Sequence, residues 1–372
     1  MSRCKLEEFI SYEQPTKYIV DSDQYDDSYE IPVLTAGKSF ILGYTDEKNN
    51  IFDDLPVIIF DDFTTSVQFV DFPFKVKSSA MKLLKNTEQA DVKYCYYLLK
   101  FLQHTPENHK RQWLSATSQN TVELPTIEEQ KNIVKKLDKI LEVIDNQNKQ
   151  LELLDEAIKA RFVEMFGDME SNTYGFEIKP FSELVEYMGD IGSNGANSVV
   201  TEHLDMKNTE DYALMVRFLN FTKNDFYNDV KYISKDAYEF FKKSQLFGGE
   251  LIMCKIGSAG LNYVMPYLNR PVSLGLNQIM IRINDKTLMP YLYQYLHSDY
   301  GEFLISGCIN GAVTKSITKT ELKKIPVIVP PMELQSQFAD FVKEVDKSKF
   351  EIQKSLEKTQ QLYDSLMQKY FG

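Results

Sequence analysis

The sequence has few of the residues that build disulfide or metal sites. Its 372 residues include four cysteines and four histidines. The cysteines form no CxxC pair, and His104 and His109 stand five residues apart rather than four. Neither set has the spacing of metal ligands. We therefore expect incidental thiols and no metal site.

Long apolar runs are also missing. No run approaches the roughly 18–20 apolar residues that a membrane-spanning helix needs. The opening stretch MSRCKLEEFISYEQ is too acidic and too polar for a signal peptide. We expect a soluble, cytoplasmic protein. The hydrophobic fraction of 43 %, with 24 Phe and 22 Tyr, is enough for the cores of two domains.

Catalytic motifs are absent from the sequence. There is no GxxxxGK[ST], no GxGxxG, and no Asn-Pro-Pro-aromatic run of the kind that amino-methyltransferases use. The DEAI stretch at 155–158 lies inside a periodic helical segment, so it does not indicate a helicase. The Asp61-Asp62 pair is predicted to cap a strand end, because adjacent strand residues point to opposite faces. We therefore expect no enzyme activity from this chain.

A net positive charge is missing too, since the formal net charge is −12. The charge is unevenly distributed, however. Residues 205–325 hold 15 basic and 12 acidic residues, and residues 72–111 hold 8 and 3. Because a local basic surface is what meets phosphates, nucleic-acid binding is not excluded.

What the sequence does contain is a long repeat. LPTIEEQ at 124–130 and VPPMELQ at 329–335 each precede a charged, periodic segment. The two segments end at Phe166-Gly167 and Phe371-Gly372, and they align without a gap at an offset of 205 residues. Proline near the start and glycine past the end are typical of helix boundaries. The sequence thus predicts two equivalent helices.

Apolar residues in both segments follow a 4–3 rhythm that is typical of a coiled coil. We expect the seam, and the surface that sets spacing and docks partners, at Leu137, Ile144, Leu151, Leu154, Ile158, Val345, Ile352 and Leu356. At 1.5 Å per residue each helix is about 55–60 Å long. Pairing in opposite directions would bury both stripes. The polar interruptions Gln147 and Lys349 either fix the register or leave a face for a partner's helix. The alternative is a helical hairpin that only adds rigidity.

Each helix follows a globular segment of short β-rich pieces and a helix-like stretch. LPVIIFDDFTTSVQFVDFPFKV precedes YCYYLLKFLQ, and GGELIMCKIGSAGLNYVMPYL precedes PYLYQYLHSDYGEFLI. This order predicts a tandem duplication. The expected fold class is α+β, with two mixed α/β domains separated by two long antiparallel coiled-coil helices. The predicted boundaries are 1–124, 125–167, 168–328 and 329–372.

These segments resemble the specificity subunit of type I restriction–modification enzymes. The repeated LPTIEEQ…FVEMFG block is similar to that family's two conserved regions. GGELIMCKIGSAG, SLGLNQIMIRI and GAVTKSITKTELKKIPVIVPP resemble one of its target recognition domains. The segment LPVIIFDDFTTSVQFVDFPFKVKSSAMKLL resembles another subclass of that domain. It has SATSQNTVE in place of a GAVTKS-like run.

The resemblance implies a non-catalytic subunit in which each domain reads one half of a split double-stranded DNA target. It implies helices that hold the halves apart and dock two methyltransferase (modification) subunits, with restriction and translocase subunits in the same system. S-adenosylmethionine and ATP would be held by those partners, so no cofactor is expected in this chain. Methylation would also require the partner to flip the target base. The rival hypothesis is a coiled-coil adaptor whose globular domains bind proteins; a self-sufficient enzyme is a third, disfavoured by the missing motifs.

Candidate DNA contacts gather in three stretches of the second domain, where Arg can pair with guanine and Asn with adenine. They are Arg217, Asn220 and Lys223 in VRFLNFTK; Lys255, Ser258 and Asn262 around IGSAG; and Thr314, Lys315 and Ser316 in GAVTKS. In the first domain the candidates are Lys75, Lys77 and Ser78, then Lys110 and Arg111. For any single residue, a solvated turn or plain surface is the alternative.

Overall fold

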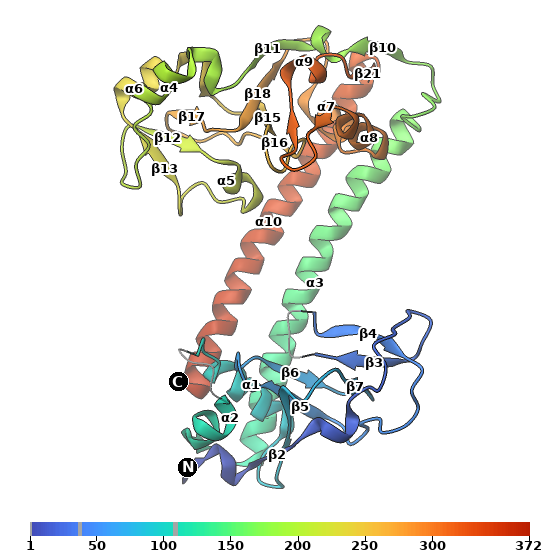
Figure 1. The fold of residues 1–372 in the computed structure, drawn as a ribbon, viewed down its shortest axis with the longest axis vertical. Helices are drawn as coiled ribbons and strands as arrows, with labels where there is room; N and C mark the ends of the chain where they lie inside the picture. The colour runs from blue at the N-terminus through green and yellow to red at the C-terminus, as the bar shows by residue number, and fades with distance from the viewer. Residues whose placement is uncertain (1, 36–38, 107–110) are drawn as a thin grey trace. The chain divides into compact units, whose positions relative to one another are not determined.

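The computed structural model describes residues 2–35, 39–106 and 111–372 (Figure 1). The chain divides into two compact units, a first unit of Met1–Gln150 with Ile352–Gly372 and a second unit of Leu151–Glu351. Each unit combines a β-rich part with segments of two long helices, α3 (Ile127–Phe166) and α10 (Met332–Phe371). The predicted mixed fold with two long helices is therefore confirmed.

Helix α3 begins where its sequence supplies a reciprocal cap. Glu129 N donates to Thr126 Oγ1 (3.3 Å), and Thr126 N donates to the Glu129 carboxylate (2.9 Å). This arrangement satisfies donors that a helix start leaves free. The helix ends at Gly167, whose φ of +76° is strained for any other residue. Helix α10 follows two prolines, Pro330 and Pro331, which fit the start of a helix but not its interior.

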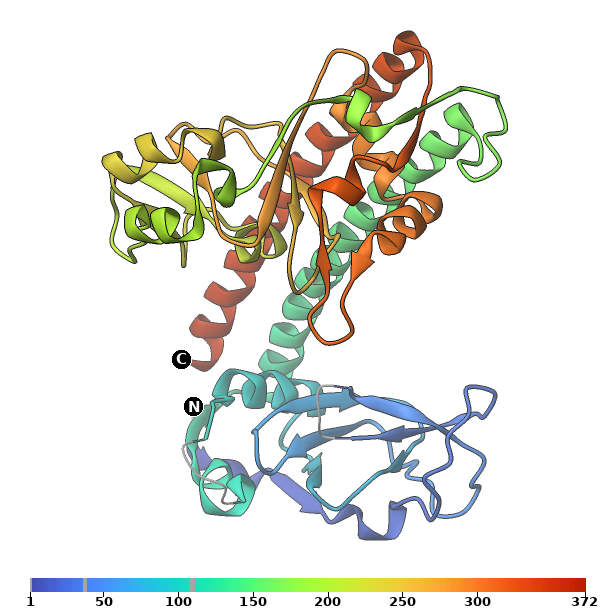
Figure 2. The same cartoon turned by 45° about the horizontal axis from the view of Figure 1, so that its top comes forward.

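Within each unit, the segments of the two long helices run in opposite directions (Figure 2). In the first unit the opening half of α3 packs with the closing half of α10, and in the second unit the closing half of α3 packs with the opening half of α10. The buried seam residues are Leu137, Ile144, Tyr363 and Met367 in the first unit, and Ile158, Phe162, Phe338 and Val345 in the second. The predicted antiparallel pair is confirmed.

The predicted seam positions fall into two groups. Leu137, Ile144, Ile158 and Val345 are buried, whereas Leu151, Leu154, Ile352 and Leu356 are half-buried. Leu154 packs against the core of the second unit and Leu356 against that of the first. The buried side chains hold the helices to each other. Exposed apolar residues lie elsewhere on the two helices, at Val143, Leu153, Val163, Phe350 and Leu362.

The first unit is built on a four-stranded antiparallel sheet in the order β2-β8-β5-β6. Its strands are β2 (Ile10–Glu13), β5 (Val57–Asp61), β6 (Val67–Val70) and β8 (Met81–Asn86). A three-stranded sheet, β4-β3-β7, adds β3 (Ile31–Leu34), β4 (Ile41–Thr45) and β7 (Lys75–Val76). Strand β1 (Ser2–Lys5) pairs with β9 (Thr121–Leu124). The unit's short helices are α1 (Val92–Leu102) and α2 (Gln112–Ser115).

The second unit contains a sheet in the order β11-β18-β15-β16 and another in the order β13-β12-β17-β14. The first comprises β11 (Val185–Gly189), β15 (Leu251–Cys254), β16 (Asn262–Val264) and β18 (Gln278–Ile283). The second comprises β12 (Ala213–Val216), β13 (Lys231–Ile233), β14 (Gln245–Leu246) and β17 (Val272–Leu274). Two further strand pairs are β10 (Glu177–Pro180) with β21 (Pro326–Val329), and β19 (Ile309–Asn310) with β20 (Ser316–Ile317).

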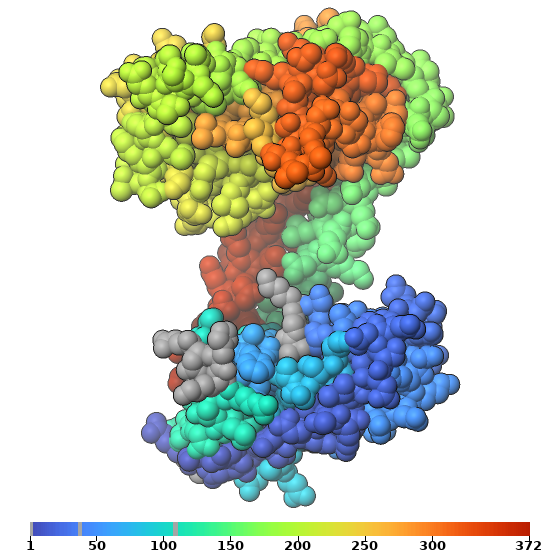
Figure 3. Space-filling model, viewed as in Figure 1, coloured from blue at the N-terminus to red at the C-terminus, as the bar shows by residue number. Residues whose placement is uncertain are grey.

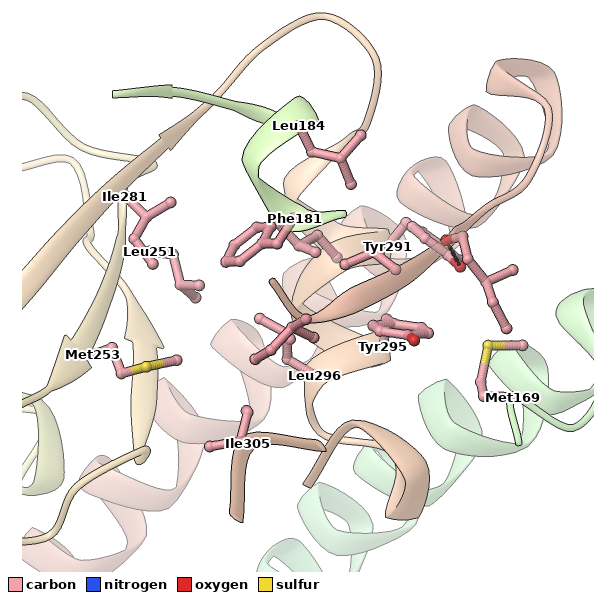
Figure 4. Packing of buried hydrophobic residues seen from close by; sticks show 14 of the residues in the cluster. Met169, Phe181, Leu184, Leu251, Met253, Ile281, Tyr291, Tyr295, Leu296 and Ile305 are labelled. Carbon is pink, nitrogen blue, oxygen red and sulfur yellow. Dashed lines mark hydrogen bonds between the residues drawn. The ribbon is translucent and has the colours of Figure 1, made fainter. Parts of the chain in front are cut away.

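The short helices of the second unit connect these strands. They are α4 (Asn197–His203), α5 (Phe218–Thr222), α6 (Lys235–Phe240), α7 (Met289–Leu296), α8 (Asp299–Gly307) and α9 (Lys319–Leu322). Helix α7 lies against the main sheet of its unit. In Figure 4, Leu251 and Ile281 of the sheet, with Phe181, line the same core as Tyr291 and Tyr295 of α7.

The two units repeat one topology. Each has a two-stranded ribbon (β1-β9 or β10-β21), a four-stranded sheet of matching order, and a second sheet that contains one parallel pair, β3 with β7 or β12 with β17. Strands β5 and β15 are fully buried in the two main sheets. Diverged sequences keep this topology because they keep apolar residues at the buried strand positions. Within the described residues, no helix is long and apolar enough to cross a bilayer.

Candidate nucleic-acid interface

Two stretches that the sequence marked separately meet in the second unit. The turn after β15 contains IGSAG, and the β19–β20 hairpin contains GAVTKS. Gly257 N donates to Lys315 O, and Ile317 N donates to Lys255 O; both hydrogen bonds are 3.0 Å long. This backbone pairing places the two loops side by side. The hairpin belongs to the face of the second unit that is turned toward the viewer in Figure 3 (orange).

The exposed side chains of this loop pair include Ser258, Thr314 and Lys315, and Val313 at the hairpin tip is 98 % exposed. Ser316 is half-buried. Asn262 is buried and its side-chain amide donates to Gly260 O (3.1 Å). Asn262 therefore holds the turn and is not at the surface, unlike the position expected for a base-reading residue.

Gly260 permits the close packing of this turn. Its φ is +93°, and a Cβ at this position would lie 2.6 Å from Ile305 Cγ2. Gly257 has a φ of +90° with nothing within 4 Å of its Cβ position, so only its backbone conformation favours glycine. Gly257 thus faces open space on the outer side of the loop, and Gly260 allows the loop to pack closely against α8.

A buried carboxylate holds the base of the loops together. Asp190, only 6 % exposed, accepts from Lys255 Nζ (2.7 Å) and Lys319 Nζ (3.0 Å), which lie at the ends of the two loops. Burial acts to raise the pKa of Asp190, but the hydrogen bonds from both ammonium groups outweigh it and lower that pKa to about 2. Asp190 is therefore ionised at neutral pH. The carboxylate neutralises part of the positive charge of Lys255 and Lys319.

The Arg217 stretch forms a capped turn next to these loops. Arg217 N donates to Asn220 Oδ1 (2.8 Å), and its guanidinium bonds to the backbone and carboxylate of Asp229. Asn220 is 2 % exposed and its amide donates to Asp225 O (3.0 Å), so it serves the turn and not the surface. Lys223 is exposed at the end of α5. Phe218 packs edge-on against Tyr263 of β16 (5.4 Å), which joins this turn to the IGSAG strand pair.

The first-unit candidates are more scattered. Lys75 is buried, 2.7 Å from the Glu47 carboxylate and 2.8 Å from Asn49 O, so it does not reach the surface. Lys77 pairs with Asp23, and Ser78 is exposed. Arg111 is exposed before α2, while Lys110 lies outside the described residues. These positions do not form a cluster equal to that of the second unit.

The Asp61-Asp62 pair has the structural role that its position predicts. Asp61 accepts from Phe63 N (2.8 Å) and Thr64 Oγ1 (2.6 Å) in the turn after β5. Asp62 accepts from Trp113 N (2.8 Å) and pairs with the buried Lys82 (3.2 Å). Both carboxylates are bonded to neighbouring groups of the fold. Across the described ranges there is no group of three or more His, Cys, Asp or Glu residues arranged to hold a metal ion.

Sequence reasoning missed Asp190, Lys319 and two buried glutamines, Gln130 and Gln335. Nothing in the local sequence around Asp190 indicates partners more than sixty residues away. The glutamines did carry a signal, because they occupy the same position in the two copies of the repeat, where both are fully buried.

The repeated topology and the antiparallel helix segments define a protein of two similar β-rich units, each built on segments of two long helices. Residues 188–362 match the family model described as the type I restriction modification DNA specificity domain. The chain is 31 % identical to the EcoR124I/EcoR124II specificity subunit of Escherichia coli over 354 residues, which covers 92 % of this chain and 85 % of that protein.

A solved structure has the same fold. The type I restriction–modification S subunit from M. genitalium aligns with a TM-score of 0.61 and 14 % identity, covering 100 % of this chain and 96 % of that one. The chain belongs to the family of type I restriction–modification specificity subunits. It is the non-catalytic subunit that gives such a complex its DNA specificity, and S-adenosylmethionine and ATP belong to the modification and restriction subunits.

Proposed function

We propose that each β-rich domain reads one half of a bipartite double-stranded DNA target, while α3 and α10 set the spacing of the halves. The proposed domains are 1–124 and 168–328, with the helical spacers at 125–167 and 329–372. The observation that carries this proposal is the repetition of one topology in two units, each of which contains a segment of both long helices. Two diverged copies of one reader are suited to two different half-sites.

In the second domain we assign DNA contact to the candidate side chains that reach the surface of the IGSAG turn, the β19–β20 hairpin and the α5 turn. They are Arg217, Lys223, Lys255, Ser258, Thr314, Lys315 and Ser316. In the first domain the corresponding assignment is to Lys77, Ser78 and Arg111. Lysine and hydroxyl side chains are suited to phosphate contact, and Arg217 to a base edge, because phosphates dominate affinity and base edges carry specificity.

We assign the docking of two modification subunits to the outer faces of the helix pair. Exposed apolar residues lie there on both helices, including Val143, Leu153 and Val163 on α3, and Phe350 and Leu362 on α10. Isolated apolar residues are common on surfaces, but these recur along helices whose inner faces are already buried. Restriction subunits would join through the same assembly, in the cytoplasm where the DNA is.

Methylome sequencing tests the proposed function. A strain that carries the complete system is compared with one from which only this chain is deleted. We expect one asymmetric motif, split by a spacer of fixed length, to lose methylation in the deletion strain. An unchanged methylome, or loss of an unsplit motif, would contradict the proposal.

A further inference from the structure

Each long helix is fastened to its own domain by one buried glutamine. In the second unit, Gln335 Oε1 accepts from Leu288 N (2.9 Å) and Thr287 Oγ1 (3.0 Å), and its Nε2 donates to Pro330 O (2.9 Å). Leu288 is the N-terminal capping residue of α7. The Gln335 side chain therefore bridges the start of α10 and the start of α7.

The first unit repeats this arrangement. Gln130 Oε1 accepts from Asp91 N (2.8 Å), and its Nε2 donates to Pro125 O (2.9 Å) and Gln89 O (3.1 Å). Asp91 is the N-terminal capping residue of α1. In both units, one side-chain amide thus joins the proline segment that leads into the long helix to the first turn of the domain's own helix.

The chemistry of this bridge requires a carboxamide. Its oxygen accepts from backbone N–H groups and its nitrogen donates to carbonyls, so both halves of the amide are used. A hydrophobic side chain would leave a buried N–H and a buried carbonyl unpaired, and a glutamate would place a charge against carbonyl oxygens. Because the planar group is bonded on both edges, it fixes the angle at which the long helix leaves the domain.

The same domain helix also receives the end of the other long helix. Phe166, at the end of α3, packs edge-on against Tyr291 of α7 (4.8 Å). Phe371, at the end of α10, packs against Tyr94 of α1 (5.3 Å). Helices α1 and α7 therefore each contact the start of one long helix and the end of the other. The glutamine provides the directional hydrogen bonds of that junction.

We propose that Gln130 and Gln335 are positioning residues that enforce the spacer length set by the long helices, by fixing the orientation of each recognition domain on its helix. This inference rests on the proposed function. One base pair more or less moves a half-site by about 3.4 Å and turns it by about 35°, so a junction of defined angle is needed to reject the wrong spacing. Among the described residues, the side-chain hydrogen bonds of the two glutamines go to Asp91, Gln89, Pro125, Thr287, Leu288 and Pro330, which lie outside the loops assigned to DNA.

The test measures methylation on a plasmid library in which the two half-sites are separated by the native spacer or by one base pair more or fewer. The full chain is co-expressed with its modification subunit. For the wild type we expect the native spacing to be methylated about tenfold more than either neighbour, as mismatched targets usually are. For Gln335→Met and Gln130→Met we expect this ratio to fall to about threefold or less, with the half-site bases unchanged.

Two further substitutions separate positioning from simple stability. Thr287→Val removes one of the bonds to Gln335 and is the milder variant if Gln335→Met fails to fold; we expect it to relax the spacing in the same direction. Ile279→Val weakens the core of the second unit away from the junction, and Gln337→Met changes an exposed residue of the same helix turn. Both should keep the wild-type spacing ratio.

If the junction variants methylate more slowly but keep the wild-type spacing ratio, the glutamines are only structural and the inference is overturned. If Ile279→Val relaxes the spacing as much as Thr287→Val, general destabilisation is the cause and the inference is likewise overturned. If the wild type shows no split target at all, the proposed function itself fails, which is a distinct result.

Discussion

The side-chain amide of Gln147 donates a hydrogen bond of 2.8 Å to Ser355 Oγ across the helix pair of the first unit. In the second unit, Lys349 Nζ lies 2.6 Å from the Asp155 carboxylate in the same way. Gln147 and Lys349 are polar interruptions of the apolar seams. Each finds a partner on the opposite helix, so they fit the fixing of register and not the provision of an open face.

Replacing Gln147 by Leu should raise the free energy of unfolding by about 1 kcal/mol, because its buried Oε1 has no partner and leucine extends the apolar seam. Urea denaturation of the full chain measures the change. Gln150→Leu, on an exposed position of the same helix, is the control and should stay within about 0.5 kcal/mol of the wild type. A clear loss of stability in Gln147→Leu would show that the bond to Ser355 contributes more than the apolar contact does.

Substituting Leu356 by Asp should lower the free energy of unfolding by about 2–3 kcal/mol, since it places an unpaired charge against the core of the first unit. We expect weaker assembly with the modification subunits as well. Thermal unfolding and size-exclusion chromatography with the partner report the two effects. Leu362→Asp lies on the same helix at a position that is 51 % exposed, and should leave stability nearly unchanged while still weakening docking. Equal stability of the two variants would argue against a stabilising role of Leu356 in the seam.

The Asp190→Asn substitution should destabilise the second unit by about 1–2 kcal/mol at pH 7, a value kept small because both lysine partners are partly exposed to solvent. The carboxyl pKa is lowered in the folded protein, to about 2, so its contribution is fully present above the unfolded pKa of about 4. It is lost as the pH falls toward 2. Wild type and variant should therefore differ equally at pH 7 and pH 5, and the difference should shrink at pH 3.

This pH series also tests the ion pairs themselves. A difference that changes between pH 7 and pH 5 would mean that another group, and not Asp190, is titrating. An Asn variant as stable as the wild type at pH 7 would mean that Lys255 and Lys319 do not need the carboxylate.

Lys315→Ala should weaken DNA binding about uniformly across target sequences and reduce the salt dependence of the affinity by about one ion, as loss of a single phosphate contact does. Fluorescence anisotropy of the assembled complex over a salt series measures the slope. The control is Lys324→Ala. The Lys324 ammonium already pairs with Glu321 (2.8 Å), so this variant should leave the slope unchanged. A selective loss at one base position would instead assign Lys315 to base reading.

Arg217→Ala should relax specificity at one position of one half-site, at a cost of about 1–3 kcal/mol for the preferred base. The other half-site should remain unchanged, because the residue belongs to the second domain alone. Methylation of a library randomised in both half-sites gives both results in one experiment. An equal loss on all sequences would assign the guanidinium, which also bonds to Asp229, to a phosphate or to the turn.

The long helices could be predicted from the sequence because their signals are local, and their direction because antiparallel pairing buries both apolar stripes. The 4–3 spacing around Leu137 and Val345, the leading prolines and the closing glycines all lie within the segments themselves. The strand pattern was sufficient to predict two β-rich domains. Their matching sheet order was not visible, because strand order depends on pairings between distant segments.

The candidate surface was predicted less completely, because a sequence reports charge but not depth. Lys75 looks like its neighbours in a basic stretch, yet Glu47, 28 positions earlier, draws it into the interior. Asn220 and Asn262 have the side chains of base readers, but their amides complete buried turns. The contact of Gly257 with Lys315 depends on a backbone pairing that no local pattern encodes.

The ribbons β1–β9 and β10–β21 have a consequence for how such chains can change. In each case the first strand of a domain pairs with its last, so the polypeptide enters and leaves the domain through neighbouring strands. A whole domain can then be replaced by another through two recombination events, one in each strand of this ribbon. New DNA specificities could be acquired by such shuffling without any change in the paired helices.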